Sequence, residues 1–246
     1  GGVLMRTIPN EHSGRLNTDD ISLAIRGSNI HQPPTRLLCL ENTHNRCSGA
    51  VLTPLDTQRT ADLMGSKDIP IHLDGARIFN AAVALKLPTQ SLTERVDSVS
   101  FCLSKGLGAP VGSLLCGTSD FIRRARKWRK MLGGGMRQAG IIASSGKIAL
   151  NQSIKQLAVD HVNAQYLADA INKIDYFNIE IERIKTNILY FTMNDDKING
   201  AEFVQLMYDK GIKFFEVSKN KFRLVTHSGI NQDDIKYVIE TFNKVN

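Results

Sequence analysis

Three short apolar stretches of the chain each end in residues whose side chains can do chemistry. The first is followed by Glu41–Asn45, the second by Asp74–Arg77 and the third by Ser104–Lys105. In open α/β sheets, ligands bind beside the carboxyl ends of the parallel strands. If the three stretches are such strands, one edge of the sheet carries carboxylates, a guanidinium, an amine and an imidazole. We therefore expect a ligand site at this edge.

Lys105 is the residue whose position suggests covalent chemistry. It follows an apolar stretch and precedes a glycine-rich segment, residues 106–112, that leaves room for a planar ring. A lysine at the end of an apolar strand is partly desolvated, which lowers the pKa of its amine and makes it a nucleophile. Such an amine forms a Schiff base with an aldehyde, and pyridoxal phosphate is the usual aldehyde cofactor. Asp74 can then be the anion that keeps the pyridine nitrogen protonated.

Each of these residues also has a structural interpretation. An aspartate after a strand is commonly a helix cap, a lysine before glycine commonly lies in a solvated turn, and His44 can satisfy backbone groups in a loop. Another phosphate ligand also remains open as the occupant. The residues alone therefore do not decide between cofactor chemistry and a structural role.

The elements that position these residues follow from alternating strand and helix patterns. Strands are expected at 3–8, 36–40, 69–73, 97–103 and 112–116, and helices from 17–20 onward and at 54–64, 76–85, 119–132 and within 138–175. This alternation predicts an α/β domain with a mainly parallel sheet.

The pattern changes after residue 178. Further strands are expected at 179–184, 188–193, 213–217 and 222–226, with helices at 201–210 and 231–243. We therefore predict a large α/β domain over residues 1–160 and a small α+β domain over residues 161–246.

Composition excludes some classes of protein. The 246 residues are 42% hydrophobic and 22% charged, too apolar for a disordered chain. No apolar run approaches the ~18–20 residues of a membrane span, and the first residues lack the apolar region of a secretory signal. The four cysteines form no metal-binding pattern, and three of them lie in apolar stretches as packed free thiols would. We expect a cytoplasmic protein without a metal site.

A run of basic residues, 123–130, raises the alternative of a nucleic-acid surface. The net charge of +7 is compatible with that interpretation. Helical spacing, however, distributes these charges around the axis and places Phe121, Ala125 and Trp128 on one stripe. We expect a solvated or intersubunit helix and no nucleic-acid partner.

Five segments resemble the low-specificity L-threonine aldolases, in order along nearly the whole chain. They are LENTHN at 40–45, HLDGARI at 72–78, SFCLSKGLGAPVG at 100–112, MLGGGMRQAG at 131–140 and FRLVTH at 222–227. The resemblance implies the pyridoxal-phosphate-dependent transferase-like fold, which is the aspartate aminotransferase fold or fold type I. It also implies that the large domain is N-terminally incomplete, since family members have a portion upstream of Gly1.

By this resemblance Lys105 is the Schiff-base lysine and Asp74 is the partner of the ring nitrogen. Arg77 and Arg137 join them in the cofactor site, Arg137 as a helper for the cofactor phosphate or for the architecture of the site. Arg77 and Arg223 form the pair that holds the substrate carboxylate. His44 lies near the β-hydroxyl of the substrate as a catalytic residue.

The activity implied is cleavage of L-threonine or L-allo-threonine to glycine and acetaldehyde with pyridoxal 5'-phosphate, in a homotetramer without membrane partners. Two alternatives remain open. One is a degenerate or truncated homologue with weak or no catalysis, and the other is a different pyridoxal-phosphate-dependent amino-acid lyase.

Overall fold

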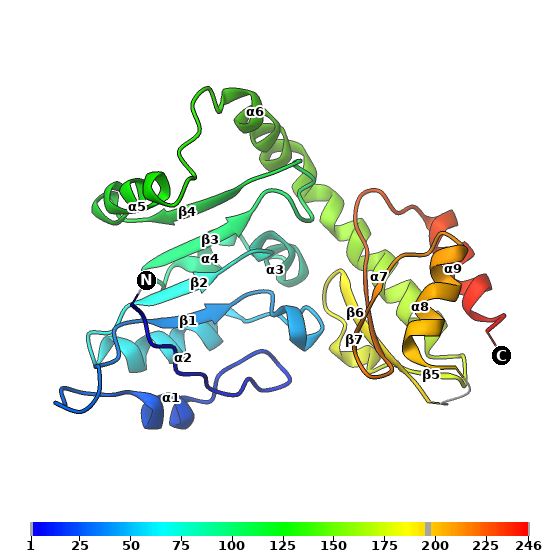
Figure 1. Ribbon diagram of the computed structural model, residues 1–246, viewed down its shortest axis with the longest axis horizontal. Helices are drawn as coiled ribbons and strands as arrows, with labels where there is room; N and C mark the ends of the chain where they lie inside the picture. The colour runs from blue at the N-terminus through cyan, green and yellow to red at the C-terminus, as the bar shows by residue number, and fades with distance from the viewer. Residues whose placement is uncertain (1, 195–197, 246) are drawn as a thin grey trace. The chain divides into compact units, whose positions relative to one another are not determined.

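The computed structural model describes residues 2–194 and 198–245, which form two compact units (Figure 1). The first unit consists of the residues up to 44 together with 51–154. The second consists of the short segment 45–50 and the residues from 155 onward. The domain boundary expected between residues 160 and 161 stays a prediction.

A four-stranded sheet organises the first unit. Its strands are β1 (Leu38–Glu41), β2 (Ile71–Asp74), β3 (Ser98–Cys102) and β4 (Ser113–Gly117), in that spatial order. Strands β1, β2 and β3 are parallel, and β4 runs antiparallel to β3. In this register Glu41 pairs with Asp74, and Asp74 pairs with Ser100. The expected mainly parallel sheet is confirmed.

Helices of the first unit begin where the sequence supplies caps. The Asn17 side chain accepts hydrogen bonds from the backbone N–H groups of Asp19 and Asp20, and Pro54 opens the second helix. The helices are α1 (Thr18–Ala24), α2 (Pro54–Gly65), α3 (Ile78–Leu85), α4 (Thr89–Thr93), α5 (Ser119–Met131) and α6 (Gly140–Ile148).

The core of this unit lies on one face of the sheet. Leu40, Ile71 and Leu73 are buried there together with Ile21 of α1, Met64 of α2 and Ile78 of α3. Because side chains alternate along a strand, Cys39 lies on the opposite face. Cys39 and Cys116 are exposed free thiols, so the expectation that they are buried is wrong.

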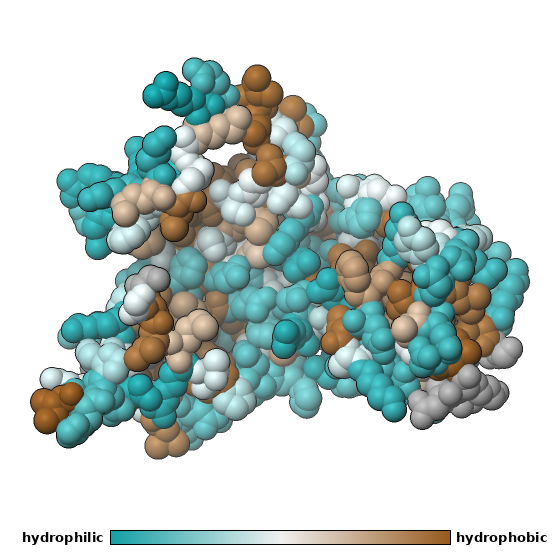
Figure 2. Space-filling view, viewed as in Figure 1, coloured by the Kyte–Doolittle hydropathy of each residue, from teal (hydrophilic) through white to brown (hydrophobic). Residues whose placement is uncertain are grey.

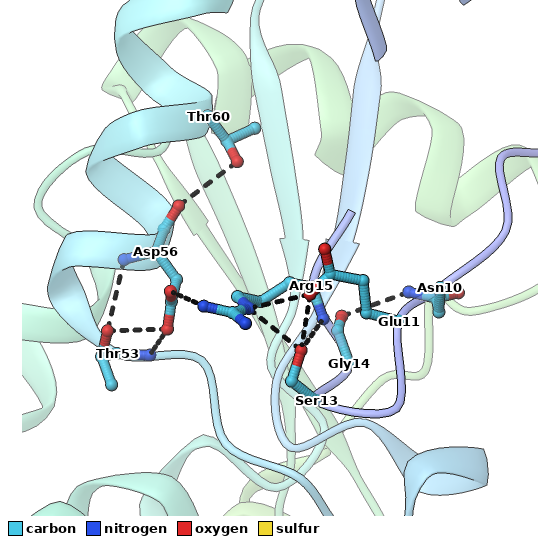
Figure 3. A network of polar contacts seen from close by, with 8 residues as sticks. All are labelled: Asn10, Glu11, Ser13, Gly14, Arg15, Thr53, Asp56 and Thr60. Carbon is cyan, nitrogen blue, oxygen red and sulfur yellow. Dashed lines mark hydrogen bonds and ion pairs between the residues drawn. The ribbon is translucent and has the colours of Figure 1, made fainter. Parts of the chain in front are cut away.

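Figure 3 shows the polar contacts that join the N-terminal segment, residues 10–15, to α2 and its N-cap. The Arg15 guanidinium contacts Glu11 at 3.1 Å and Asp56 at 3.4 Å. Asp56 also accepts hydrogen bonds from the backbone and hydroxyl of Thr53, which caps α2. Burial alone raises the pKa of Asp56, but the Thr53 hydrogen bonds and the Arg15 charge outweigh it, so this pKa lies below its ordinary value.

The basic helix α5 has no buried residue, and Trp128 is 60% exposed. In α6, Ile141 and Ile148 are exposed as well, and apolar patches appear over this part of the unit in Figure 2. The predicted apolar stripe of α5 therefore does not pack into the core of the described chain.

The second unit contains an antiparallel sheet and a core rich in phenylalanine. Phe191, Phe203 and Phe222 pack there with ring centroids 5.1–6.3 Å apart. The strands are β5 (Phe177–Asn178), β6 (Ile188–Met193), β7 (Phe215–Ser218) and β8 (Lys221–Val225), in the order β5-β6-β8-β7. Its α-helices are α7 (Leu157–Ile171), α8 (Gly200–Asp209) and α9 (Gln232–Phe242), and 3₁₀ turns occur at Asn45–Cys47 and Ile181–Arg183.

Two predicted strands are wrong. Residues 3–8 form no strand, and the side chains of Val3, Leu4 and Met5 are exposed. The range 179–184 contains the 3₁₀ turn instead, from which Ile179 and Ile184 both reach the core. The alternating apolar residues of this segment are therefore buried without the segment pairing with a neighbouring strand.

Candidate active site

The hydrogen-bond ladder of the parallel strands continues into the loops at their carboxyl ends. The backbone N–H of Asn42 donates to the Asp74 carbonyl at 2.9 Å, and that of Gly75 donates to the Ser100 carbonyl at 2.8 Å. Because β1, β2 and β3 are adjacent and parallel, the residues after each strand lie at the same edge of the sheet.

Asp74 is the last residue of β2, and its side chain is exposed. One carboxylate oxygen accepts a hydrogen bond from the backbone N–H of Ala76 at 3.0 Å, which orients the group. A side chain at Gly75 would lie 3.0 Å from the Ser100 carbonyl oxygen and from Val99, so only glycine fits this turn without a shift. Arg77 follows, half-buried, at the N-cap position of α3.

Lys105 lies in the loop after β3. The loop is closed by hydrogen bonds from Leu103 N–H to the Gly112 carbonyl (2.9 Å) and from Ala109 N–H to the Leu103 carbonyl (3.0 Å). Gly108 turns the chain with a φ of +76°, a conformation that favours glycine. Leu103, Leu107 and Ala109 are buried, whereas Lys105 is exposed.

The expected partial desolvation of Lys105 is therefore wrong. The lysine follows the strand by three residues and lies in a turn that exposes it to solvent.

His44 is buried beside a carboxylate. Its Nε2 lies 3.6 Å from Oε2 of Glu41, and its Nδ1 is buried without a hydrogen-bond partner. With the proton on Nε2, facing Glu41, Nδ1 keeps its lone pair and can accept a proton from a ligand. Sequence reasoning assigned no role to Glu41, although its spacing of three residues from His44 was a usable signal.

A buried amide fixes the start of this loop. The Asn42 side chain donates to the Leu52 carbonyl at 3.0 Å and accepts from the Leu52 N–H at 3.2 Å. These two hydrogen bonds hold together the parts of the first unit that come just before and just after segment 45–50.

Arg223 belongs to the second unit. Its Nη1 donates to Oδ1 of Asn45 at 3.2 Å, and its Nε is buried without a hydrogen-bond partner. Arg137 is exposed between α5 and α6. The structure thus brings Asp74, Arg77, Lys105 and His44 to loops that follow adjacent strands of one sheet, whereas Arg223 lies in the other unit and Arg137 in a separate loop.

The residues at this sheet edge fit pyridoxal phosphate by their chemistry. The exposed Lys105 amine matches an aldehyde, and the exposed Asp74 carboxylate matches a protonated pyridine nitrogen. A separate polar pocket of about 260 Å³, lined by Arg15, Asp56 and Arg59 among others, contains none of the predicted site residues.

The described part of the chain contains neither a metal-binding cluster nor a membrane-spanning helix. Residues 2–194 and 198–245 contain no group of three or more His, Cys, Asp or Glu side chains suited to a metal ion. Within the same ranges, every helix is too short or too polar to cross a lipid bilayer.

Comparison with known proteins identifies the family. The model of the beta-eliminating lyase family matches residues 1–194. Low-specificity L-threonine aldolase 1 of Arabidopsis thaliana is 36% identical over 248 residues, which are 99% of this chain and 69% of that protein. The low specificity L-threonine aldolase of Escherichia coli K12 is 37% identical over 238 residues, or 97% of this chain and 68% of the relative.

Solved structures share the fold. The threonine aldolase of Leishmania major superposes with a TM-score of 0.75 at 15% identity, over 95% of this chain and 68% of that one. A candidate L-allo-threonine aldolase of Listeria monocytogenes gives a TM-score of 0.75 at 20% identity, over 93% of this chain and 65% of that one. The chain thus spans about two thirds of the length of these proteins. It has the fold of the pyridoxal-phosphate-dependent enzymes of fold type I, and by its sequence it belongs to the beta-eliminating lyase family, among the low-specificity L-threonine aldolases.

Proposed function

We propose that the protein cleaves L-threonine or L-allo-threonine to glycine and acetaldehyde with pyridoxal phosphate as cofactor. One observation carries the proposal. In a chain of this family, three adjacent parallel strands end in loops that present Asp74, Lys105 and the Glu41–His44 pair at one edge of the sheet. These groups supply an anion, an amine and a base.

The cofactor, when bound, supplies an aldehyde for a Schiff base and a ring that accepts the electrons of the broken bond. Lys105 is the residue that would hold it covalently, through its exposed amine. Asp74 would keep the proton on the ring nitrogen, because a carboxylate favours a nearby cation. Arg77 and Arg137 would add positive charge to the cofactor site, Arg137 toward the phosphate.

The substrate needs an orienting contact and a base. Arg77 and Arg223 would bind its carboxylate, since a guanidinium forms two parallel hydrogen bonds with that group. Nδ1 of His44 would take the proton of the β-hydroxyl, whose oxygen becomes the aldehyde carbonyl as the bond between Cα and Cβ breaks. A proton returned to Cα then completes glycine. The carboxylate of Glu41, 3.6 Å from Nε2, would stabilise the protonated imidazole.

The test is acetaldehyde release from L-threonine and L-allo-threonine by the chain loaded with pyridoxal phosphate, measured with a coupled alcohol dehydrogenase. We expect release from both, and a loss of several orders of magnitude in kcat for Asp74→Ala, because the ring nitrogen loses its counter-charge. Asp175→Ala, a change at an exposed aspartate of the second unit, is the control and should keep the wild-type rate.

Two results would contradict this assignment. Cofactor binding without acetaldehyde release would favour a homologue with weak or no catalysis. Release of a β-elimination product instead would favour another amino-acid lyase of the same cofactor class. We also propose, from the family resemblance, that the protein is a cytoplasmic homotetramer, and sedimentation equilibrium would measure that assembly.

A further inference from the structure

Arg223 occupies a half-buried position on β8. Its neighbours Phe222 and Leu224 are in the phenylalanine-rich core, so the arginine lies on the opposite face of the sheet. In the register of that sheet Arg223 pairs with Tyr190 of β6 and Phe215 of β7. The guanidinium is therefore attached to a rigid central strand.

Only one hydrogen bond of this guanidinium is made to another side chain in the described residues, and its partner is Asn45. Nη1 donates to the amide oxygen at 3.2 Å, although the two residues are 178 positions apart in the sequence. Nε is buried and has no hydrogen-bond partner. A buried N–H without an acceptor lowers the stability of the fold. This cost indicates that the Nε edge of the guanidinium binds a ligand.

Asn45 is itself firmly placed. It begins the 3₁₀ turn Asn45–Cys47, and Cys47 is buried. The hydroxyl of Thr186, just before β6, donates to the Gly49 carbonyl at 3.0 Å. Gly49 has a φ of +68°, and a Cβ there would collide with Thr186 Oγ1, so the segment packs closely against the residues before β6 within the second unit. A rigid support of this kind can orient a functional side chain.

The amide is suited to this task because it is a neutral acceptor. It fixes Nη1 and does not itself neutralise the positive charge of the guanidinium. A carboxylate in its place would form an ion pair with Arg223 and compete with any anionic ligand. With Nη1 engaged, the edge formed by Nε and Nη2 remains for a planar carboxylate, which that edge binds through two parallel hydrogen bonds.

We propose that Asn45 is a positioning residue that holds Arg223 in the orientation needed to bind the α-carboxylate of the substrate. This inference rests on the proposed function, in which Arg223 binds that carboxylate. Asn45 acts through Arg223 and touches no reacting atom, and its neutrality preserves the affinity of the site for an anion.

Kinetics of two variants test the proposal with L-threonine as substrate. Asn45→Ala loses the support, and we expect KM to rise about tenfold with kcat nearly unchanged, the effect of one hydrogen bond to a charged group. Asn45→Asp keeps the size but adds a charge, and we expect KM to rise further, to about 100-fold. Asn178→Ala, at an exposed position of β5, is the matched control and should leave KM unchanged.

A readout independent of activity is the rotation of the Arg223 guanidinium. In the wild type, the hydrogen bond from Nη1 should slow rotation about the Cζ–Nε bond, so arginine side-chain NMR should resolve Nη1 from Nη2. In Asn45→Ala the two signals should average. Averaged signals in the wild type, or no change in the variant, would overturn the proposal.

Arg223→Lys separates this proposal from the proposed function. If Arg223→Lys leaves KM unchanged, the role of Arg223 is wrong. If it raises KM but Asn45→Ala and Asn45→Asp do not, the role of Asn45 is wrong. In the Arg223→Lys background, Asn45→Ala should have no further effect. If the chain turns over neither amino acid, the proposed function fails, and NMR still decides whether Asn45 holds Arg223.

Discussion

At the scale of single residues, the candidate site combines exposed reactive groups with buried atoms that lack partners. Lys105 and Asp74 are exposed, whereas Nδ1 of His44 and Nε of Arg223 are buried and unpaired. Each buried unpaired polar atom costs about 1–3 kcal/mol of stability. A ligand group that satisfied either nitrogen atom would recover part of that cost, which supports the proposed role of each residue in substrate binding.

His161 of α7 provides a test of pH dependence away from these groups. Burial lowers the pKa of His161 from 6.5 to about 4. Between these values the unfolded chain binds a proton that the folded chain does not, so His161 destabilises the fold as pH falls from 6.5 toward 4. Above pH 6.5 this effect is absent.

We therefore expect the urea midpoint of the wild type to fall between pH 7 and pH 5 by more than that of His161→Gln. His12→Gln, at an exposed position, serves as the control and should follow the wild type. An equal pH response in the wild type and His161→Gln would contradict the assignment.

Sequence reasoning identified the chemical types of the site residues but not their environments. The motif around Lys105 marked an amine at a strand end, yet its exposure depends on how the loop 103–112 closes. The contact of Asn45 with Arg223 joins positions 178 residues apart, and no local pattern signals it.

At the scale of elements, local signals predicted most helices and strands. Caps at Asn17 and Thr53 lie where helices begin, and three apolar runs became the parallel strands. The five-residue helix α4, Thr89–Thr93, was missed because so short a segment shows little periodicity. Strand pairing is a tertiary property, which explains the errors at 3–8 and 179–184.

The two hydrogen bonds between the Asn42 side chain and the Leu52 backbone should contribute strongly to the stability of the first unit. Asn42 is 1% exposed and satisfies both backbone groups of Leu52. Asn42→Ala removes two hydrogen bonds and leaves buried groups unpaired, so we expect the free energy of unfolding to fall by about 2–4 kcal/mol. Urea denaturation followed by circular dichroism measures this change.

Asn10→Ala is the control, because the exposed Asn10 side chain donates a hydrogen bond to the Gly14 carbonyl and the substitution removes only that side-chain contact. Its cost should stay below about 1 kcal/mol. If Asn42→Ala were no more destabilising than Asn10→Ala, the hydrogen bonds between Asn42 and Leu52 would not stabilise the loop that carries His44.

At the scale of the whole molecule, the fold class and the family were both predictable from sequence. Five motifs in the family's order supported them, and the matched family model and relatives confirm the family. The assignment of segment 45–50 to the second unit was not predictable, because it depends on contacts such as that between Thr186 and Gly49, 137 residues apart.

The central claim is that the amine of Lys105 forms an imine with pyridoxal phosphate. The direct measurement is reduction of the loaded chain with borohydride, followed by mass spectrometry of its peptides. We predict one dominant adduct, on Lys105, and its loss in Lys105→Ala, whereas Lys127→Ala, a change in the exposed helix α5, should label like the wild type. An adduct distributed over surface lysines, or one unchanged in Lys105→Ala, would contradict the account.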